Sequence, residues 1–151
     1  MQTNFSGDKN EPGGTILRGS AISLRAVVAW LLILGCAVVN GVLREAILLP
    51  RIGTPWALVI SGLLLSACVV VVAWLLVAKL GRLANRQYFL LGAFWLVLTL
   101  GFEFTFGRVV QDKPWSELFA AYQFENGNMW PVVLAVVLFA PLAAARLQHQ
   151  T

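Results

Sequence analysis

A single carboxylate interrupts a long apolar run of this chain. Glu103 lies in the segment from Thr99 to Arg108, and the run that this segment closes begins near Tyr88. A carboxylate within such a run is costly to remove from water, so it is usually paired or turned towards a polar space. Ion pairing, proton exchange and the binding of an ion or a small polar solute are therefore the chemistries open to Glu103.

Other polar residues lie near the ends of two apolar runs. If the first and third runs cross in the same direction, their far ends lie at similar depth. Counting from each start, Asn40 is level with Glu103 and Arg44 is level with Arg108. We expect Arg44 to reach Glu103 while Glu45 meets Arg108. The sequence thus predicts one polar cluster, made of Asn40, Arg44, Glu45, Thr99, Glu103 and Arg108.

No other group of residues has the spacing of a catalytic, cofactor or metal site. The single histidine, His149, lies near the C-terminus, and Cys36 and Cys68 stand alone within apolar runs. No Cys-x-x-Cys pair, zinc-like spacing, phosphate-binding loop or nucleophile elbow is present. We therefore expect no metal and no cofactor, and we do not expect an enzyme.

The composition is that of a membrane protein. Of 151 residues, 59% are hydrophobic and 12% are charged, whereas a soluble domain carries about 25% charged residues. The net charge of +4 comes from basic residues that flank apolar runs, which is typical of membrane orientation and not of nucleic-acid binding. The lipid bilayer is thus the expected partner, and nucleic acid is not.

Four apolar runs are long enough to be helices that cross a bilayer, which takes about 20 residues. We predict an all-α integral membrane four-helix bundle. Its domains are a flexible cytoplasmic tail over residues 1–20 and a four-span transmembrane domain over residues 21–147. The spans run over residues 22–49, 56–78, 88–107 and 130–145.

Glycine and proline mark the connections between these spans. Pro55 suits the first turn of the second span, and the segment from Asn126 to Asn128 predicts a turn before Pro131 opens the fourth. Pro141 is expected either to kink the fourth span or to end it early.

A short amphipathic helix is predicted between spans 3 and 4. Trp115, Leu118, Phe119 and Tyr122 are spaced as one helical stripe. The segment is too short and too polar to cross a bilayer. It is expected either to lie on the membrane surface or to fold over the mouth of the bundle.

Basic residues set the expected orientation, since Lys and Arg concentrate in cytoplasmic segments. One side of the predicted topology carries seven, namely Lys9, Arg18, Arg25, Lys79, Arg82, Arg86 and Arg146, and the other carries Arg44, Arg51, Arg108 and Lys113. Both termini are therefore expected to be cytoplasmic. A lipoprotein-like cleavage box ending at Cys36 is the rival interpretation of the first run. A plain span is favoured because the apolar run continues beyond that cysteine.

Three segments together resemble a group of small four-helix bacterial inner-membrane proteins that has no assigned activity. They are residues 40–45, residues 102–108 and residues 115–131, and the resemblance covers about Arg25 to Leu147. It implies the architecture and a bacterial cell membrane, and brings no activity. Small multidrug transporters carry their essential glutamate in the first span, where this chain has only Glu45. The third-span pattern of fluoride channels is also absent.

Two functions remain open. The favoured one is a structural or accessory membrane component, in which an ion-paired clasp joins spans 1 and 3. The alternative is a transporter or channel for a small solute, an ion or protons that acts as a homo-oligomer; the partner would otherwise be another membrane protein. A polar cavity that reaches Glu103 would favour transport, whereas a dry contact with Arg44 or Arg108 would favour the clasp.

Overall fold

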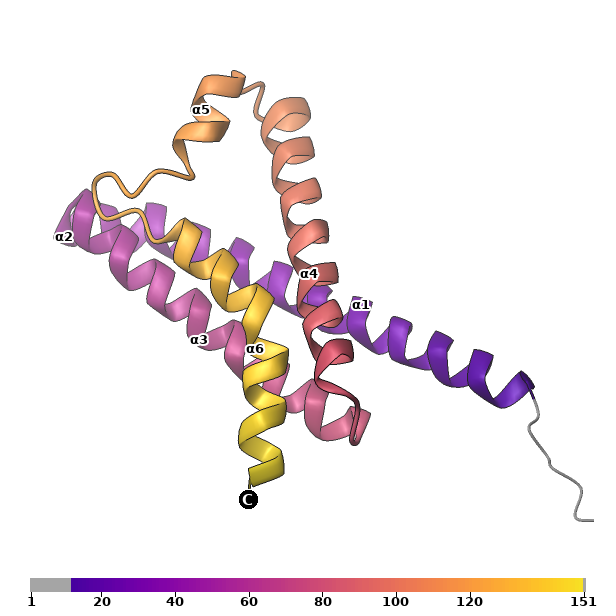
Figure 1. Cartoon of the computed structure of the whole chain (residues 1–151). Coiled ribbons are helices and arrows are strands. Elements are labelled where there is room, and N and C mark those ends of the chain that lie inside the picture. The colour runs from indigo at the N-terminus through magenta and orange to yellow at the C-terminus, as the bar shows by residue number, and fades with distance from the viewer. Residues whose placement is uncertain (1–11, 151) are drawn as a thin grey trace, which may run out of the picture.

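The computed structural model describes residues 12–150, and this part of the chain is helical with no strand. Figure 1 shows the long helices crossing one another, with the short helix α5 beyond the end of α4. The elements are α1 (Pro12–Leu43), η1 (Arg44–Leu48), α2 (Leu49–Ile52), α3 (Thr54–Leu80), α4 (Asn85–Thr105), η2 (Phe106–Val110), α5 (Trp115–Ala120) and α6 (Trp130–Gln150).

Four helical stretches are long and apolar enough to cross a membrane, which confirms that part of the predicted fold. They are Gly19–Ile52, Thr54–Leu80, Asn85–Val110 and Trp130–Gln150. The third begins three residues before its predicted start at Tyr88, and the fourth continues beyond the predicted end at Ala145. Hydropathy alone places helix ends poorly, because polar residues extend a helix without adding to its apolar run.

The predicted tail falls partly outside the described residues. Residues 1–11 lie outside them, and residues 12–20 form the first turns of α1.

The predicted turns are present. Gly53 ends α2 with φ 79°, a conformation that favours glycine, and Pro55 lies in the first turn of α3. Asn126 and Gly127 also have positive φ, 53° and 81°. A side chain on Gly127 would overlap the carbonyl oxygen of Pro55, so this glycine lets the segment before α6 rest on the start of α3.

Helix α6 lies between α3 and α4 and packs against both, while α1 packs mainly against α3. Gly92 brings α4 close to α6, because a Cβ there would overlap the carbonyl oxygen of Leu138. The largest fully buried side chains of this core are Trp95 and Tyr88 of α4, Val69 and Val77 of α3, and Val137 and Pro141 of α6.

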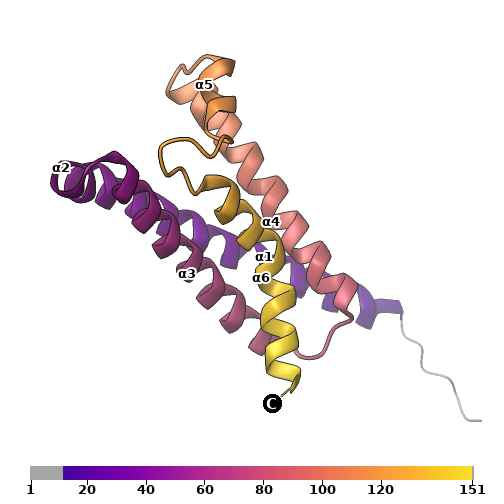
Figure 2. The same cartoon turned by 60° about the vertical axis from the view of Figure 1, so that its left-hand side comes forward.

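Pro141 does not end α6, which continues to Gln150. Proline has no N–H, so the carbonyl of Val137 loses its helical partner, and the ring crowds the preceding turn. Both views show α6 changing direction near its middle (Figures 1 and 2). Of the two outcomes expected from the sequence, the kink is the one observed.

Two helices widen at the end of the molecule that carries α5. The π-helical segments η1 and η2 continue α1 and α4 respectively. One-turn π segments within α-helices are frequent at functional sites, because the extra residue redirects the side chains around it.

Candidate functional site

A cavity of about 400 Å³ lies between the long helices at the end that carries α5. Four of the six predicted cluster residues line it, namely Asn40, Arg44, Thr99 and Glu103. Glu45 and Arg108 do not. The rest of the wall is largely apolar and includes Trp30, Phe102 and Phe106. The structure therefore brings part of the predicted cluster to a single space.

Glu103 is held by two neutral donors. Its Oε2 accepts a hydrogen bond from the Tyr122 hydroxyl at 2.9 Å and another from the Trp130 indole Nε1 at 2.9 Å. Among the described residues no Lys or Arg nitrogen lies within salt-bridge distance of this carboxylate. The Glu103 carboxyl group is thus held by two neutral donors and has no countercharge in contact among the described residues.

Tyr122 belongs to the segment after α5 and stays a donor. Burial, together with its hydrogen bond to the Glu103 carboxylate, raises the pKa of Tyr122 above its ordinary value. The phenol therefore keeps its proton and can hold Glu103. Phe104 stacks on the Tyr122 ring with centroids 5.8 Å apart, which fixes the orientation of the phenol.

Asn40 carries an unsatisfied polar atom. Its Nδ2 donates to the hydroxyl of Ser61 at 2.8 Å and to the carbonyl of the same residue at 3.1 Å, which joins α1 to α3. Its Oδ1 is buried and has no hydrogen-bond partner within the described chain. A buried amide oxygen without a partner is costly, which makes Asn40 a polar group of the cavity wall to be accounted for.

Thr99 sets the level at which α1 meets α4. Its hydroxyl donates to the carbonyl of Trp95 at 2.8 Å and accepts from the indole of Trp30 at 3.1 Å. The indole of Trp95 donates in turn to the carbonyl of Ala26 at 2.9 Å. Both contacts between α1 and α4 join residues that are 69 positions apart.

This register corrects the predicted ion pairs. Asn40 and Glu103 are 63 positions apart in the sequence, whereas the observed contacts between α1 and α4 join residues that are 69 positions apart. The observed register therefore differs from the predicted one by six residues, or about 9 Å along a helix. Residue 34 is then level with Glu103. Counting residues from helix starts assumed parallel helices, whereas α1 and α4 cross and contact each other at few positions.

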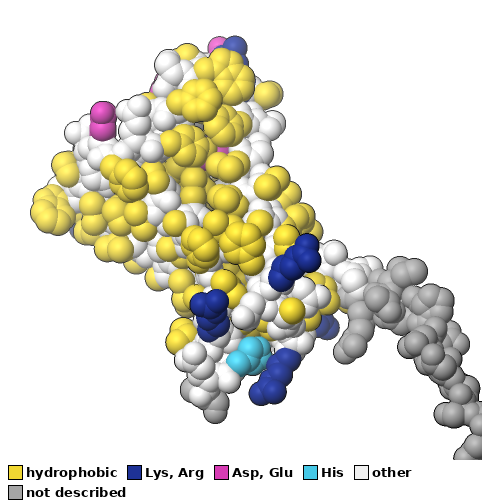
Figure 3. All heavy atoms as spheres, in the orientation of Figure 1, with side chains coloured by type: hydrophobic (Ala, Val, Ile, Leu, Met, Phe, Trp, Pro, Cys, Tyr) yellow, Lys and Arg dark blue, Asp and Glu magenta, His cyan; other side chains and the backbone are white. Residues whose placement is uncertain are grey.

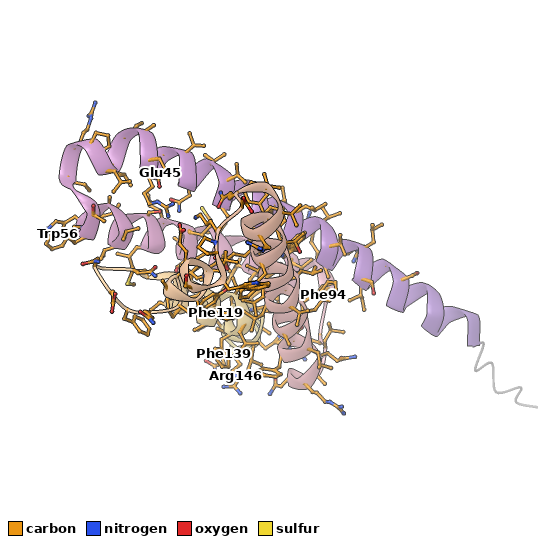
Figure 4. The ribbon with its side chains drawn as sticks, turned by 90° about the horizontal axis from the view of Figure 1, so that it is seen from above. Glu45, Trp56, Phe94, Phe119, Phe139 and Arg146 are labelled. Atoms are coloured by element: carbon orange, nitrogen blue, oxygen red, sulfur yellow. The ribbon has the colours of Figure 1, made fainter. Side chains whose placement is uncertain are left out.

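The basic members of the cluster have other partners. Arg44 pairs with the adjacent Glu45 at 3.1 Å. Arg108 donates to the carbonyl of Lys113 at 3.2 Å and lies 3.9 Å from the carboxylate of Asp112. The expected pairs Arg44–Glu103 and Glu45–Arg108 are therefore wrong. Seen from above, Glu45 lies on the α1 side of the molecule, away from Phe119 of α5 (Figure 4).

The segment with α5 folds over the cavity. Leu118 is buried, lines the cavity and packs on Gly107, where a side chain would collide with it. Trp115 and Phe119 stay more than half exposed. The predicted amphipathic helix thus turns Leu118 inward, as expected for a helix over the mouth, and leaves two aromatic rings outside.

Charges of both signs line the cavity. Besides Arg44 and Glu103 these are Lys113 and Glu117, which lie 3.8 Å apart. No group of three His, Cys, Asp or Glu side chains that could hold a metal occurs in residues 12–150. The arrangement offers hydrogen-bond acceptors and charges to a small polar molecule.

Sequence reasoning missed Ser61, Tyr122 and Trp130. Tyr122 was expected only as part of the amphipathic stripe, and Trp130 was not among the expected cluster residues. The available signal was chemical, because an indole N–H and a phenol are the neutral donors that an unpaired carboxylate requires.

No family model, no curated protein and no solved structure matches this chain.

Proposed function

We propose that this chain is a multi-pass protein of a bacterial inner membrane, with both termini cytoplasmic, that takes a small polar solute into the cavity at Glu103. Four long apolar helices support the membrane location. The concentration of Lys and Arg near the α3–α4 connection and the C-terminus supports the orientation.

The observation that carries this proposal is the unneutralised carboxylate on the cavity wall. Within residues 12–150, Glu103 accepts two hydrogen bonds from neutral donors and contacts no cation, and Asn40 on the α1 side has a buried oxygen without a partner. Ionisable groups within membrane spans are costly and commonly mark a path for an ion or a solute. Asn40 and Glu103 both line this cavity, and an acceptor such as the Glu103 carboxylate suits a solute that carries N–H or O–H donors.

The core below the cavity favours transport by a homo-oligomer. Trp95 and Tyr88 are completely buried between the cavity and the basic end of the molecule. These two rings fill the core of the described chain below the cavity. A solute path that is formed between copies of the chain in a homo-oligomer leaves this core packed.

A structural or accessory role is the second candidate. Glu103 joins α4 to α6 and to the segment after α5 through its two hydrogen bonds, and it does so without a solute. In this second candidate function, the neutral donors Tyr122 and Trp130 take the place that the predicted clasp gave to an arginine. The chain then packs against another membrane protein.

Cysteine labelling separates the two candidates. In a chain with Cys36 and Cys68 replaced by Ala, Thr99→Cys tests the cavity wall. Val97→Cys is the control, because Val97 on the same helix is 67% exposed to the surroundings of the molecule. In cells, a small cationic methanethiosulfonate should label Thr99→Cys at least about tenfold faster, since only a hydrated thiol ionises and reacts readily. Equal labelling at both positions, or none at residue 99, would contradict the solute site.

A further inference from the structure

A second hollow lies between α1 and α3, in the half of the molecule away from Glu103. Its volume is about 660 Å³. Its walls are Leu24, Val28, Ala29 and Leu32 of α1 and Val72, Leu75 and Leu76 of α3. Several of these side chains are exposed, Leu24 by 66% and Leu75 by 58%, so the groove opens to the outside of the molecule.

Two cationic side chains, those of Arg25 and Lys79, lie at one end of this groove. The Arg25 guanidinium reaches across from α1 and donates to the carbonyl of Lys79 at the end of α3, at 3.1 Å. Both side chains line the groove and are exposed. Neither forms a salt bridge within the described residues. A planar guanidinium beside an ammonium is well suited to bind a phosphate group.

All charged residues around this end of the groove are basic in the described chain. Arg82 and Arg86 follow Lys79, and Arg146 lies near the C-terminus. Every Asp and Glu that the structure describes belongs to the opposite half, and on the face drawn in Figure 3 the lower end carries dark blue but no magenta side chains. An acidic ligand group would therefore find charge complementarity here and no repulsion.

We infer that this groove binds one anionic phospholipid, with its phosphate at Arg25 and Lys79 and an acyl chain along the apolar walls. From Leu24 to Leu32 the groove runs about 12 Å at the helical rise of 1.5 Å per residue. That is close to the depth of one leaflet, which is half of the roughly 30 Å hydrocarbon core. The inference needs the membrane location but does not depend on the solute cavity.

A second copy of the chain fits this groove less well. In two copies related by a rotation axis along the membrane normal, the same residue lies at the same depth in the membrane. Arg25 and Lys79 of one copy would then face the same cations of the other. A phospholipid neutralises these charges and also covers the apolar walls.

The test is native mass spectrometry of the full-length protein in detergent, titrated with dioleoyl phosphatidylglycerol or dioleoyl phosphatidylcholine. We expect the anionic lipid to bind about tenfold more tightly, which corresponds to one or two charge-assisted hydrogen bonds. The double substitution Arg25→Gln with Lys79→Gln should remove this preference. The control, Arg82→Gln with Arg86→Gln, changes the net charge equally but leaves the groove intact, and should keep it.

A further variant tests the apolar walls without changing any charge. Val28 is half-exposed, so Val28→Trp can fill the groove from its open side, and it should weaken phosphatidylglycerol binding several-fold. Three results would overturn the inference: equal binding of the two lipids, equal loss in both double variants, or unchanged binding by Val28→Trp. A lipid-free dimer that Val28→Trp dissociates would also overturn it and would assign the groove to a second copy.

Discussion

At the scale of single residues, the cavity depends on how one carboxylate is stabilised. The neutral donors Tyr122 and Trp130 satisfy one oxygen of Glu103 and bring no positive charge to it. A contacting guanidinium would have supplied a countercharge as well. Glu103 thus combines a structural contact with an electrostatic one, and substitution can separate the two.

We predict that Glu103→Gln keeps the fold and loses the charge effect. The amide oxygen of Gln can still accept from Tyr122 and Trp130, so the melting temperature in detergent should change little. The ratio of cationic to anionic methanethiosulfonate labelling at Thr99→Cys should fall several-fold, because the carboxylate no longer attracts the cation.

Glu103→Ala is predicted to lose the hydrogen bonds as well. Two donors would be left without their acceptor, which should lower the free energy of unfolding by about 1–3 kcal/mol given the measured strength of hydrogen bonds in membranes. Unfolding titrations in detergent measure this loss. If Glu103→Gln destabilised the protein as much as Glu103→Ala, the separation of the two contacts would be refuted.

The sequence predicted Glu103 as a site residue but not its partners. An ionisable residue in an apolar run is visible from the chain alone, because its cost depends only on the local environment. Whether Arg44 could be its partner depends on the register between α1 and α4, which the indoles of Trp30 and Trp95 set through contacts between residues 69 positions apart. No local pattern contains that register.

At the scale of helices, close approach rests on small residues. Gly92 of α4 touches the backbone of α6 at Leu138. Contact between helix backbones favours association in an apolar solvent, where dispersion and packing replace the hydrophobic effect. This contact holds α4 and α6 together along the core that contains Trp95.

We predict that Gly92→Ala destabilises the protein by about 1–3 kcal/mol, the usual cost of overpacking. The added Cβ would push against backbone, which cannot rotate away. Gly101→Ala is the matched control, since Gly101 lies on the same helix with nothing within 4 Å of a Cβ. Thermal unfolding of both variants in one detergent measures the difference. Equal melting temperatures would show that the close approach carries no stability.

The helices themselves were largely predictable, and their arrangement was not. Hydropathy runs and the prolines at the starts of the second and fourth spans, Pro55 and Pro131, are local signals, so four long apolar helices followed from the sequence, and the stripe from Trp115 to Tyr122 predicted the short one. The crossing of α1 over α4 depends on which side chains pack, and the straight-bundle assumption failed there. Helix ends also shifted, as at Gln150, because polar final turns add no hydropathy.

At the scale of the whole molecule, charge is divided between two ends. The described acidic residues lie in the half that carries α5, alongside basic ones such as Arg108 and Lys113, whereas the α3–α4 connection and the end of α6 carry only basic charges (Figure 3). Such a division orients a membrane protein, because Lys and Arg resist translocation.

Reporter fusions test the proposed orientation. Alkaline phosphatase inserted after Gln123, in the segment between α5 and α6, should be active because the enzyme folds only outside the cytoplasm. Green fluorescent protein fused after the C-terminus should fluoresce in the cytoplasm. The opposite pattern, with an inactive phosphatase and a dark C-terminal fusion, would reverse the orientation.

The bend of α6 at Pro141 divides this helix between two environments. Its first half carries Trp130 and Val133 on the wall beside Glu103, and its second half packs Ala144 and Ala145 into the dry core. A missing backbone hydrogen bond at the junction makes tilting of one half relative to the other inexpensive. For the proposed solute uptake, we expect the outer half of α6 to tilt at Pro141 as a hinged wall while the inner half stays packed in the core.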